Sequence, residues 1–292
     1  MGAMSHPARS PIPRVLSIAG TDPTGGAGIQ ADLKSIAANG GYAMAVVTAL
    51  VAQNSLGVRA IHIPPPEFLS EQLRSVSDDV TIDAVKIGML ANADVVDVVE
   101  SWLEETTPPI VVLDPVMVST SGRRLLEPEA EASVVRLLTR VDLVTPNLRE
   151  LGALLGEPPA AEWAGAVRLA GRLSERHGVT VLLKGGHLGG PGSPDALVDA
   201  TGRLPGGRHL FQSDATRVNT RNTHGTGCSL SSAMATVQAR SSDWAASLTE
   251  AKEWLEDSLR HADELDVGSG NGPIHHLHRL WDAASRTPRQ SS

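Results

Sequence analysis

The sequence predicts a three-layer α/β/α sandwich with a mostly parallel central sheet. Short runs of β-branched residues alternate with amphipathic helical patterns along most of the 292 residues. Strands that are apolar on both faces and separated by helices form parallel sheets that helices cover on both sides. A composition of 41% hydrophobic and 20% charged residues is typical of a globular chain with a sizeable core. We therefore expect one α/β domain over residues 14–282.

The predicted elements follow one another in a regular order. Parallel strands are predicted, from the apolar runs, at 14–19, 46–51, 84–87, 110–113, 143–145 and 179–183. Helices are predicted, from the 3.6-residue periodicity, at 28–39, 67–78, 94–104, 164–177, 227–240 and 243–265. Segment 196–211 has glycine-rich turns between short strand candidates, which indicates antiparallel strands at one edge of the sheet. Residues 1–13 and 283–292 are expected to be disordered, and residues 1–3 to be an expression-tag remnant.

Composition and charge exclude several classes of protein. Lys plus Arg is 25 and Asp plus Glu is 33, which gives a net charge of −8 and argues against a nucleic-acid partner. Apolar stretches such as 43–52 are far shorter than the ~20 residues that span a bilayer, so no membrane partner is expected. No secretion signal is visible, and Cys228, the only cysteine, cannot form an internal disulfide. A reducing, cytoplasmic location fits best.

Three glycine-rich clusters follow predicted strands or open a predicted helix: 20–28, 184–187 and 222–228. Ligands of parallel α/β sheets bind beyond the carboxyl ends of the strands, where helices begin. In the last cluster Gly225, Thr226 and Gly227 would offer backbone N–H groups at the positive end of a helix. Such a turn suits a phosphoryl group in transfer, but a glycine turn with a Thr cap explains it equally well. No P-loop motif is present, so this turn is the candidate phosphate site.

Seven motifs together resemble a known family. They are AGTDPTGGAGIQAD (19–32), TALVAQN (48–54), KIGML (86–90), LDPVM (113–117), TPNLRE (145–150), KGGH (184–187) and NTHGTGC (222–228). In this order they resemble the hydroxymethylpyrimidine/phosphomethylpyrimidine kinases of thiamine biosynthesis, in the ribokinase-like superfamily. The resemblance covers about residues 15–281 and includes GPIHHLH (272–278). It implies a ribokinase-like fold.

The resemblance implies roles for the residues at the last turn. Gly225, Thr226 and Gly227 would form an anion hole, and Cys228 would be the general base for a primary alcohol. A thiol at a helix N-terminus is expected to have its thiolate favoured by the dipole and by nearby N–H groups. The alternative is a packed thiol, since a free cysteine often behaves as a small hydrophobic residue.

The resemblance also implies a pyrimidine site. It places the amide of Gln53 on the ring, where one acceptor and two donors can pair bidentately with a ring nitrogen and an amine. Around the ring it places Gly20, Asp32, Met89 and Val116. Asp32 is expected close to the mouth of the pocket, although a solvated helix acid is the alternative. Met89 would be a soft wall against the ring, and core packing fits it equally well.

On the nucleotide side the resemblance implies Asp114 and Glu150 as acids that position Mg²⁺, which prefers hard oxygen ligands and retained waters. Asn147, Lys184 and Thr226 would bind the nucleotide, with Lys184 facing the phosphates. A lone lysine at a strand end is usually solvated, but the glycines after it allow a ligand to approach closely.

The resemblance implies ATP-dependent phosphorylation of 4-amino-5-hydroxymethyl-2-methylpyrimidine, and then of its monophosphate to the pyrophosphate. It implies ATP and Mg²⁺, with a monovalent cation as an open question, and a homodimer. A pyridoxine/pyridoxal kinase is the first alternative, and a non-catalytic vitamer or nucleotide sensor the second. His275, His276 and His278 lack the spacing of a zinc site and are predicted to be structural or on the surface.

Overall fold

The computed structural model describes residues 12–119, 122–186 and 188–281 of the chain. These residues contain one nine-stranded sheet, in the order β3-β2-β1-β4-β5-β6-β7-β8-β9. The strands are β1 (Arg14–Gly20), β2 (Tyr42–Asn54), β3 (Gly57–His62), β4 (Ala84–Ile87), β5 (Val111–Leu113), β6 (Leu143–Val144), β7 (Thr180–Lys184), β8 (Asp195–Val198) and β9 (Leu210–Ser213). The α-helices are α1 (Gly28–Ala38), α2 (Pro66–Ser77), α3 (Ala93–Thr106), α4 (Glu131–Leu137), α5 (Leu148–Leu155), α6 (Trp163–His177), α7 (Thr226–Ser241) and α8 (Trp244–Arg260).

Six strands of the sheet run parallel, as the sequence predicts. They pair in the order β2, β1, β4, β5, β6 and β7. The antiparallel strands predicted in segment 196–211 are β8 and β9, which extend the sheet beyond β7. At the other edge β2 pairs with β3 in an antiparallel hairpin that the sequence did not predict. Both edges of the sheet are therefore closed by antiparallel strands.

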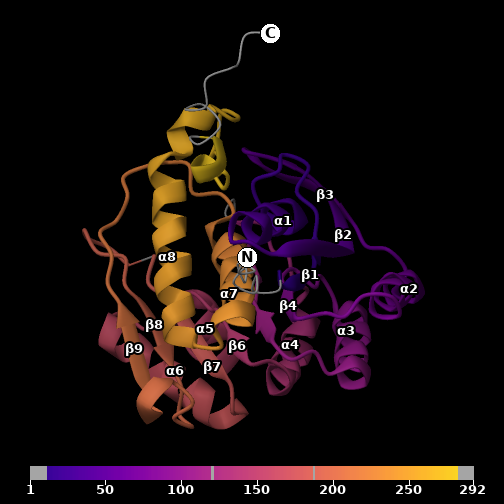
Figure 1. The fold of residues 1–292 in the computed structure, drawn as a ribbon, viewed down its shortest axis with the longest axis horizontal. Helices are drawn as coiled ribbons and strands as arrows, with labels where there is room; N and C mark the ends of the chain where they lie inside the picture. The colour runs from indigo at the N-terminus through magenta and orange to yellow at the C-terminus, as the bar shows by residue number, and fades with distance from the viewer. Residues whose placement is uncertain (1–11, 120–121, 187, 282–292) are drawn as a thin grey trace, which may run out of the picture.

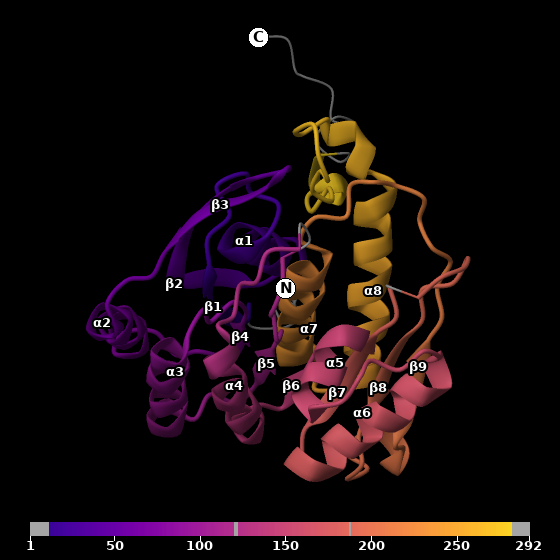
Figure 2. The same ribbon diagram turned by 180° about the vertical axis from the view of Figure 1, so that it is seen from behind.

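Alternate residues of each parallel strand face opposite helical layers. Leu16 and Val85, for example, belong to a core formed with α2, α3, α4, α5 and α6. Their neighbours Val15 and Ala84 belong to a second core, formed with α1, α7 and α8. Figures 1 and 2 show the molecule from these two sides. The predicted three-layer sandwich is confirmed, because the inner parallel strands bury both faces.

Several predicted elements have different limits in the structure. β2 extends well beyond the predicted strand 46–51, and the helix predicted at 243–265 ends at Arg260, before a 3₁₀ turn at Ala262–Leu265. The short helices α4 and α5 were not predicted, because seven and eight residues hold barely two turns of periodic pattern. The predicted disorder of 1–13 and 283–292 falls almost wholly outside the described residues.

The histidines near the C-terminus are structural. His275, His276 and His278 are buried, with 4%, 4% and 3% of their surface exposed, so the surface alternative is wrong. Among the described residues, no group of three or more His, Cys, Asp or Glu side chains is arranged to hold a metal ion.

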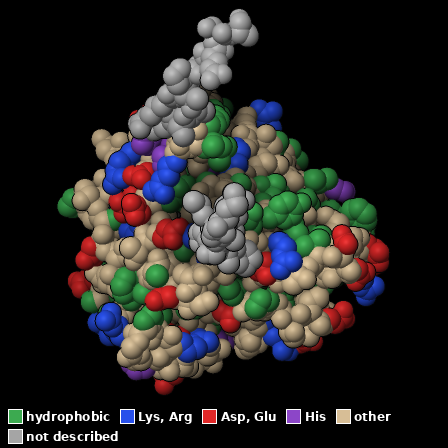
Figure 3. All heavy atoms as spheres, in the orientation of Figure 1, with side chains coloured by type: hydrophobic (Ala, Val, Ile, Leu, Met, Phe, Trp, Pro, Cys, Tyr) green, Lys and Arg blue, Asp and Glu red, His purple; other side chains and the backbone are tan. Residues whose placement is uncertain are grey.

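The outer surface mixes charges of both signs. On the face shown in Figure 3 the described Lys and Arg side chains are interspersed with Asp and Glu. No helix within the described ranges has both the length and the apolar character needed to cross a membrane.

Candidate active site

Residues from the ends of β5 and β7 and from the first turn of α5 gather near the first turn of α7. Lys184, at the end of β7, donates from Nζ to Asp114 Oδ1 at 2.8 Å and lies 4.0 Å from Glu150 Oε2. A Cβ atom added at Gly227 would lie 3.3 Å from Lys184 Nζ and 3.4 Å from Asp114 Oδ2. Four predicted site residues therefore lie in one cluster. They are the phosphate-facing Lys184, the metal-positioning acids Asp114 and Glu150, and the anion-hole residue Gly227. The parallel sheet brings them together because its carboxyl ends share one edge.

The two acids of this group differ in charge state. Burial alone would raise the pKa of Asp114, but the charges of Lys184 and Lys86 outweigh it and hold this pKa below its usual range. Burial raises the pKa of Glu150 to about 7, and the negative charge of Asp114 adds to the rise while Lys184 opposes it. Lys184 thus forms its ion pair with Asp114, and Glu150 is the acid that titrates near neutrality.

The turn that opens α7 packs against the glycine-rich loop after β1. Gly225 has a φ of 79°, which favours glycine. A Cβ atom at Gly225 would lie 1.8 Å from the carbonyl oxygen of Gly26. In the same loop a Cβ atom at Gly28 would lie 2.3 Å from the oxygen of Gly20. The first and third glycine clusters of the sequence therefore form one close-packed unit that admits no side chains at these positions.

Cys228 follows this turn, partly exposed, in the first turn of α7. Burial raises the pKa of its thiol to about 11; the charge of Lys86 and the backbone N–H of Gly28 oppose the rise, and Asp32 adds to it. This direction is opposite to the lowered pKa expected for a thiol at a helix N-terminus. Desolvation of a charged sulfur outweighs the effects of Lys86 and the Gly28 N–H here.

Asp32 does not lie at the mouth of a pocket. Its carboxylate is fully buried and forms an ion pair with Lys86 Nζ, at 2.7 Å to Oδ1 and 2.9 Å to Oδ2. Ser17 Oγ donates to Oδ2 at 2.6 Å and Ser232 Oγ to Oδ1 at 2.8 Å. Each carboxylate oxygen atom accepts two hydrogen bonds inside the protein. The expected position of Asp32 close to the mouth of the pocket is therefore wrong. Its contact with a pyrimidine remains a prediction, which these four internal bonds disfavour.

Other predicted pyrimidine residues lie along β1, β2 and the loop after β4. A Cβ atom at Gly20 would lie 3.0 Å from the sulfur of Met89, and Met89 packs with Val51 in a small apolar cluster. The Gln53 amide, half-buried beside a bulge in β2, has no hydrogen-bond partner within the described ranges. Val116 is half-buried beyond the end of β5. Gln53 is thus the group in this set with unused hydrogen-bonding capacity.

Asn147 has a local structural task. Its side-chain oxygen accepts from the backbone N–H groups of Arg149 and Glu150 at 2.9 and 3.0 Å, and its own N–H donates to Glu150 Oε2 at 2.8 Å. This capping box fixes the start of α5 and aims Glu150 at Lys184. Thr226 is half-buried and begins α7. The nucleotide contacts of Asn147 and Thr226 remain predictions.

Sequence reasoning assigned no role to Lys86, Asp22 or His224, although all three stand in the quoted motifs. The sequence did contain an indication that Lys86 is paired, because a lysine inside the otherwise apolar strand 84–87 needs a buried partner. Asp22 is fully buried and accepts from His224 Nε2 at 2.8 Å, across 202 positions of sequence. No local pattern indicates that pairing.

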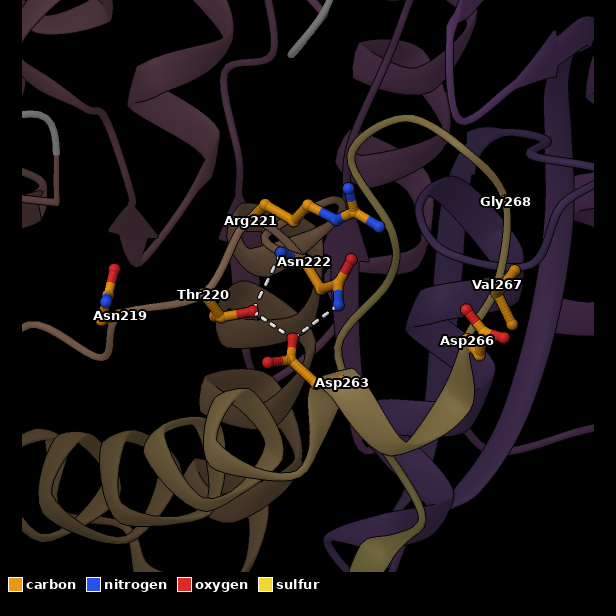
Figure 4. A pocket seen from close by; sticks show the side chains of 8 residues that line it. All are labelled: Asn219, Thr220, Arg221, Asn222, Asp263, Asp266, Val267 and Gly268. Carbon is orange, nitrogen blue, oxygen red and sulfur yellow. Dashed lines mark hydrogen bonds between the residues drawn. The ribbon is translucent and has the colours of Figure 1, made fainter.

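A cavity of about 390 Å³ lies beside the turn that opens α7 (Figure 4). Its lining consists of Asn219, Thr220, Arg221, Asn222, Asp263, Asp266, Val267 and Gly268. Thr220 Oγ1 and Asn222 Nδ2 both donate to Asp263 Oδ1 at 2.7 Å. None of the predicted site residues lines this cavity.

Comparisons with known proteins agree with the geometry. Residues 22–275 match the family described as phosphomethylpyrimidine kinase. A hydroxymethylpyrimidine/phosphomethylpyrimidine kinase of Salmonella typhimurium is 48% identical over 267 residues, which cover 91% of this chain and 98% of that protein. A thiamine biosynthesis multifunctional protein of Corynebacterium glutamicum is 53% identical over 94% of this chain. The chain spans only 36% of the length of that second relative.

Solved structures show the same fold. The ADP complex of Bacillus subtilis pyridoxal kinase superimposes with a TM-score of 0.82 at 27% identity, over 92% of this chain and 99% of that one. Fold and site together define a ribokinase-like α/β protein. Within that class, the chain belongs to the phosphomethylpyrimidine kinase family.

Proposed function

We propose that this protein transfers the γ-phosphoryl group of ATP to the hydroxymethyl oxygen of 4-amino-5-hydroxymethyl-2-methylpyrimidine. It then phosphorylates the monophosphate to the pyrophosphate used in thiamine biosynthesis. One observation carries the proposal: Lys184 and Asp114 lie beside Gly227, one residue before Cys228, and Glu150 lies 4.0 Å from Lys184 Nζ. Phosphoryl transfer is catalysed mainly by positioning and by charge stabilisation, and this cluster supplies both.

The proposed roles follow from the positions of the groups. Lys184 faces the transferred phosphate, and the N–H groups of the turn at 225–227 stabilise its developing charge. Gln53 uses its unpaired amide on the pyrimidine, with Gly20, Met89 and Val116 around the ring. Asp32 contributes to the pyrimidine site indirectly, through its buried ion pair with Lys86. Asn147 and Thr226 flank the nucleotide.

Two carboxylates of the cluster fit a magnesium ion. Mg²⁺ typically takes one or two protein carboxylates and completes its shell with phosphate oxygens and water. Asp114 and Glu150 both lie within 4.0 Å of Lys184 Nζ, and a metal ion beside Glu150 would favour the ionised carboxylate, which burial disfavours. When bound, Mg²⁺ would neutralise phosphate charge. We propose Asp114 and Glu150 as the residues that hold it, while the monovalent-ion requirement stays open.

Cys228 is the proposed acceptor of the alcohol proton. Ionising a thiol with a pKa of about 11 at pH 7 costs about 5 kcal/mol, at about 1.4 kcal/mol per unit. Lys86 and the Gly28 N–H are the groups that reduce this cost. In a loose transition state the attacking oxygen keeps its proton until late, so the thiolate is required only then.

Pyridoxal is the second candidate substrate, because the protein of the superimposed structure is named a pyridoxal kinase. That ring also carries a hydroxymethyl group. The 48% identity to a pyrimidine kinase over almost its whole length favours the pyrimidine.

One assay tests the proposal. Purified protein is incubated with Mg-ATP and either the pyrimidine alcohol or pyridoxal, and the products are identified by mass spectrometry. We expect the pyrimidine monophosphate and then the pyrophosphate, each with stoichiometric ADP. Turnover of pyridoxal alone would exclude the thiamine pathway, and binding without ADP would favour a sensor. Cys228→Ala should bind both ligands but lose most of its rate; an unchanged rate would remove Cys228 from the mechanism.

We further propose a single kinase domain over residues 14–282, a homodimer and a cytoplasmic location. The continuous nine-stranded sheet supports the first. The single cysteine fits a reducing compartment. The dimer rests on the family resemblance, and sedimentation velocity of the purified protein would test it.

A further inference from the structure

Asp22 is the centre of the loop that follows β1. Its side chain has no exposed surface. Oδ1 accepts from the backbone N–H and the hydroxyl of Thr24 at 3.0 and 2.7 Å. Oδ2 accepts from the N–H groups of Gly26 and Ala27 at 3.2 and 2.8 Å. One carboxylate therefore fixes the shape of the loop at 20–28.

His224 connects this loop to the turn that opens α7. Its Nε2 lies 2.8 Å from Asp22 Oδ2 and must carry the proton, because an ionised carboxylate can only accept. Burial would raise the pKa of Asp22, but hydrogen bonds from His224 and Thr24 hold it well below its usual range. His224 directly precedes Gly225, the residue packed against the Gly26 oxygen. The pair thus spans the two glycine-rich segments.

The C-terminal segment holds the same junction from its other side. The backbone N–H of His224 donates to Gly272 O at 3.0 Å. His276 Nε2 lies 2.9 Å from Ser229 Oγ, which itself donates to Gly225 O at 2.8 Å. Motif 272–278, which had no role in the proposed chemistry, therefore fixes the backbone of the α7 turn.

We propose that the Asp22–His224 hydrogen bond sets the distance between the pyrimidine-binding loop at 20–28 and the phosphate-binding turn at 225–228, so that His224 is a positioning residue for phosphoryl transfer. The inference rests on the proposed function, since it takes the loop as the substrate side and the turn as the phosphate side. Without the bond, the turn keeps its contacts to the C-terminal segment, while the loop keeps only its packing against the turn and loses the side-chain hydrogen bond that fixes their distance. A displacement of about 1 Å between reacting groups can lower a rate about 100-fold.

The experiment compares His224→Gln with His224→Asn. The Nε2 group of Gln can reach the position of the imidazole Nε2, whereas the shorter Asn side chain cannot. We expect Asn to lower kcat by about 10- to 100-fold with KM for ATP changed by less than threefold, and Gln to restore most of the rate. In hydrogen exchange, peptides covering 20–28 should exchange at least about tenfold faster in the Asn variant, and near the wild-type rate in the Gln variant.

A matched control is available at the opposite end of the sheet. Asp199 is equally buried and accepts hydrogen bonds from Thr180 Oγ1, Thr201 Oγ1 and Arg203 Nε at 2.7, 2.6 and 2.9 Å. Asp22→Asn, which removes the charge from the carboxylate that His224 contacts, should lower both the melting temperature and kcat, whereas Asp199→Asn should lower the melting temperature by a similar amount and leave kcat unchanged. A kcat loss that follows melting temperature in all variants would overturn the proposal.

Two further outcomes distinguish a failure of the positioning role from a failure of the proposed function. Exchange in peptides 20–28 that is unaffected by His224→Asn would overturn the positioning role, whatever the activity. A wild-type protein that forms no ADP with either alcohol would overturn the proposed function, while the exchange measurement would still decide whether the pair links the two segments.

Discussion

The buried Lys86–Asp32 pair should be a large contributor to stability that depends on both partners. Neither side chain has exposed surface, and Lys86 Nζ makes two contacts of 2.7 and 2.9 Å to the carboxylate. Lys86→Met keeps the approximate shape of the side chain and leaves Asp32 with only the hydroxyls of Ser17 and Ser232. Removal of one partner from a buried pair typically costs about 3–5 kcal/mol. We expect Lys86→Met to lower the free energy of unfolding by this amount.

The measurement is urea unfolding, with thermal unfolding as a second readout. For a chain of 292 residues, at about 2.1 cal/mol/K of unfolding entropy per residue, a loss of about 3–5 kcal/mol lowers the melting temperature by roughly 5–8 °C. Asp32→Asn should also destabilise, because it leaves a buried ammonium group. The double variant should be more stable than the sum of the two losses predicts, by at least about 1 kcal/mol, because it leaves no unpaired charge.

An exposed pair supplies the control. Arg74 and Glu71 lie 3.9 Å apart with 58% and 69% of their side chains exposed. Arg74→Met should change the free energy of unfolding by less than about 1 kcal/mol. A Lys86→Met variant within about 1 kcal/mol of wild type would refute the reasoning, as would additive losses in the double-variant cycle.

Three other predictions follow from the site. Cys228, the only thiol, should react with iodoacetamide about tenfold faster per pH unit up to a pKa of about 11; a plateau below pH 9 would contradict this. Burial lowers the pKa of His276 to about 3, whereas an unfolded histidine titrates near ~6.5, so the unfolded chain binds this proton first on acidification. As the pH falls from 6 to 4, His276 should therefore lower the free energy of unfolding by about 1.4 kcal/mol per pH unit. Urea unfolding at several pH values should show a weaker pH dependence for His276→Gln than for wild type. Gly227→Ala adds a Cβ atom 3.3 Å from Lys184 Nζ, so ADP formation should drop at least about tenfold while the free energy of unfolding stays within about 1 kcal/mol; full activity would show that this space is not needed.

Much of the fold could be predicted because its signals are local. The apolar runs at 84–87 and 179–183 are β4 and most of β7, and the glycine-rich turns of 196–211 lie between two antiparallel strands. The hairpin strand Gly57–His62 was missed, because it is largely exposed and has no strong alternation of apolar and polar residues.

The candidate site was predicted in part. The approach of Asp114 and Lys184 to Gly227 follows from one rule, that parallel strands end at a common edge; Glu150 reaches Lys184 from the first turn of α5. The position of Asp32 was wrong, because a helix residue near a glycine turn can face either the solvent or the sheet. Only the packing of α1 against β1 and β2 turns its side chain toward the sheet, where it meets Lys86 of β4.

The sequence by itself determined the fold class, the order of the motifs, the family and the strand ends at which the glycines gather, because these depend on patterns between neighbours in the chain. Only the tertiary structure decided the charge states and the pairings. Lys86 meets Asp32 across 54 positions and His224 meets Asp22 across 202. Burial of Cys228 among distant segments reverses the effect expected from its helix terminus. Desolvation and Coulomb energies depend on distances through space, which no local pattern encodes.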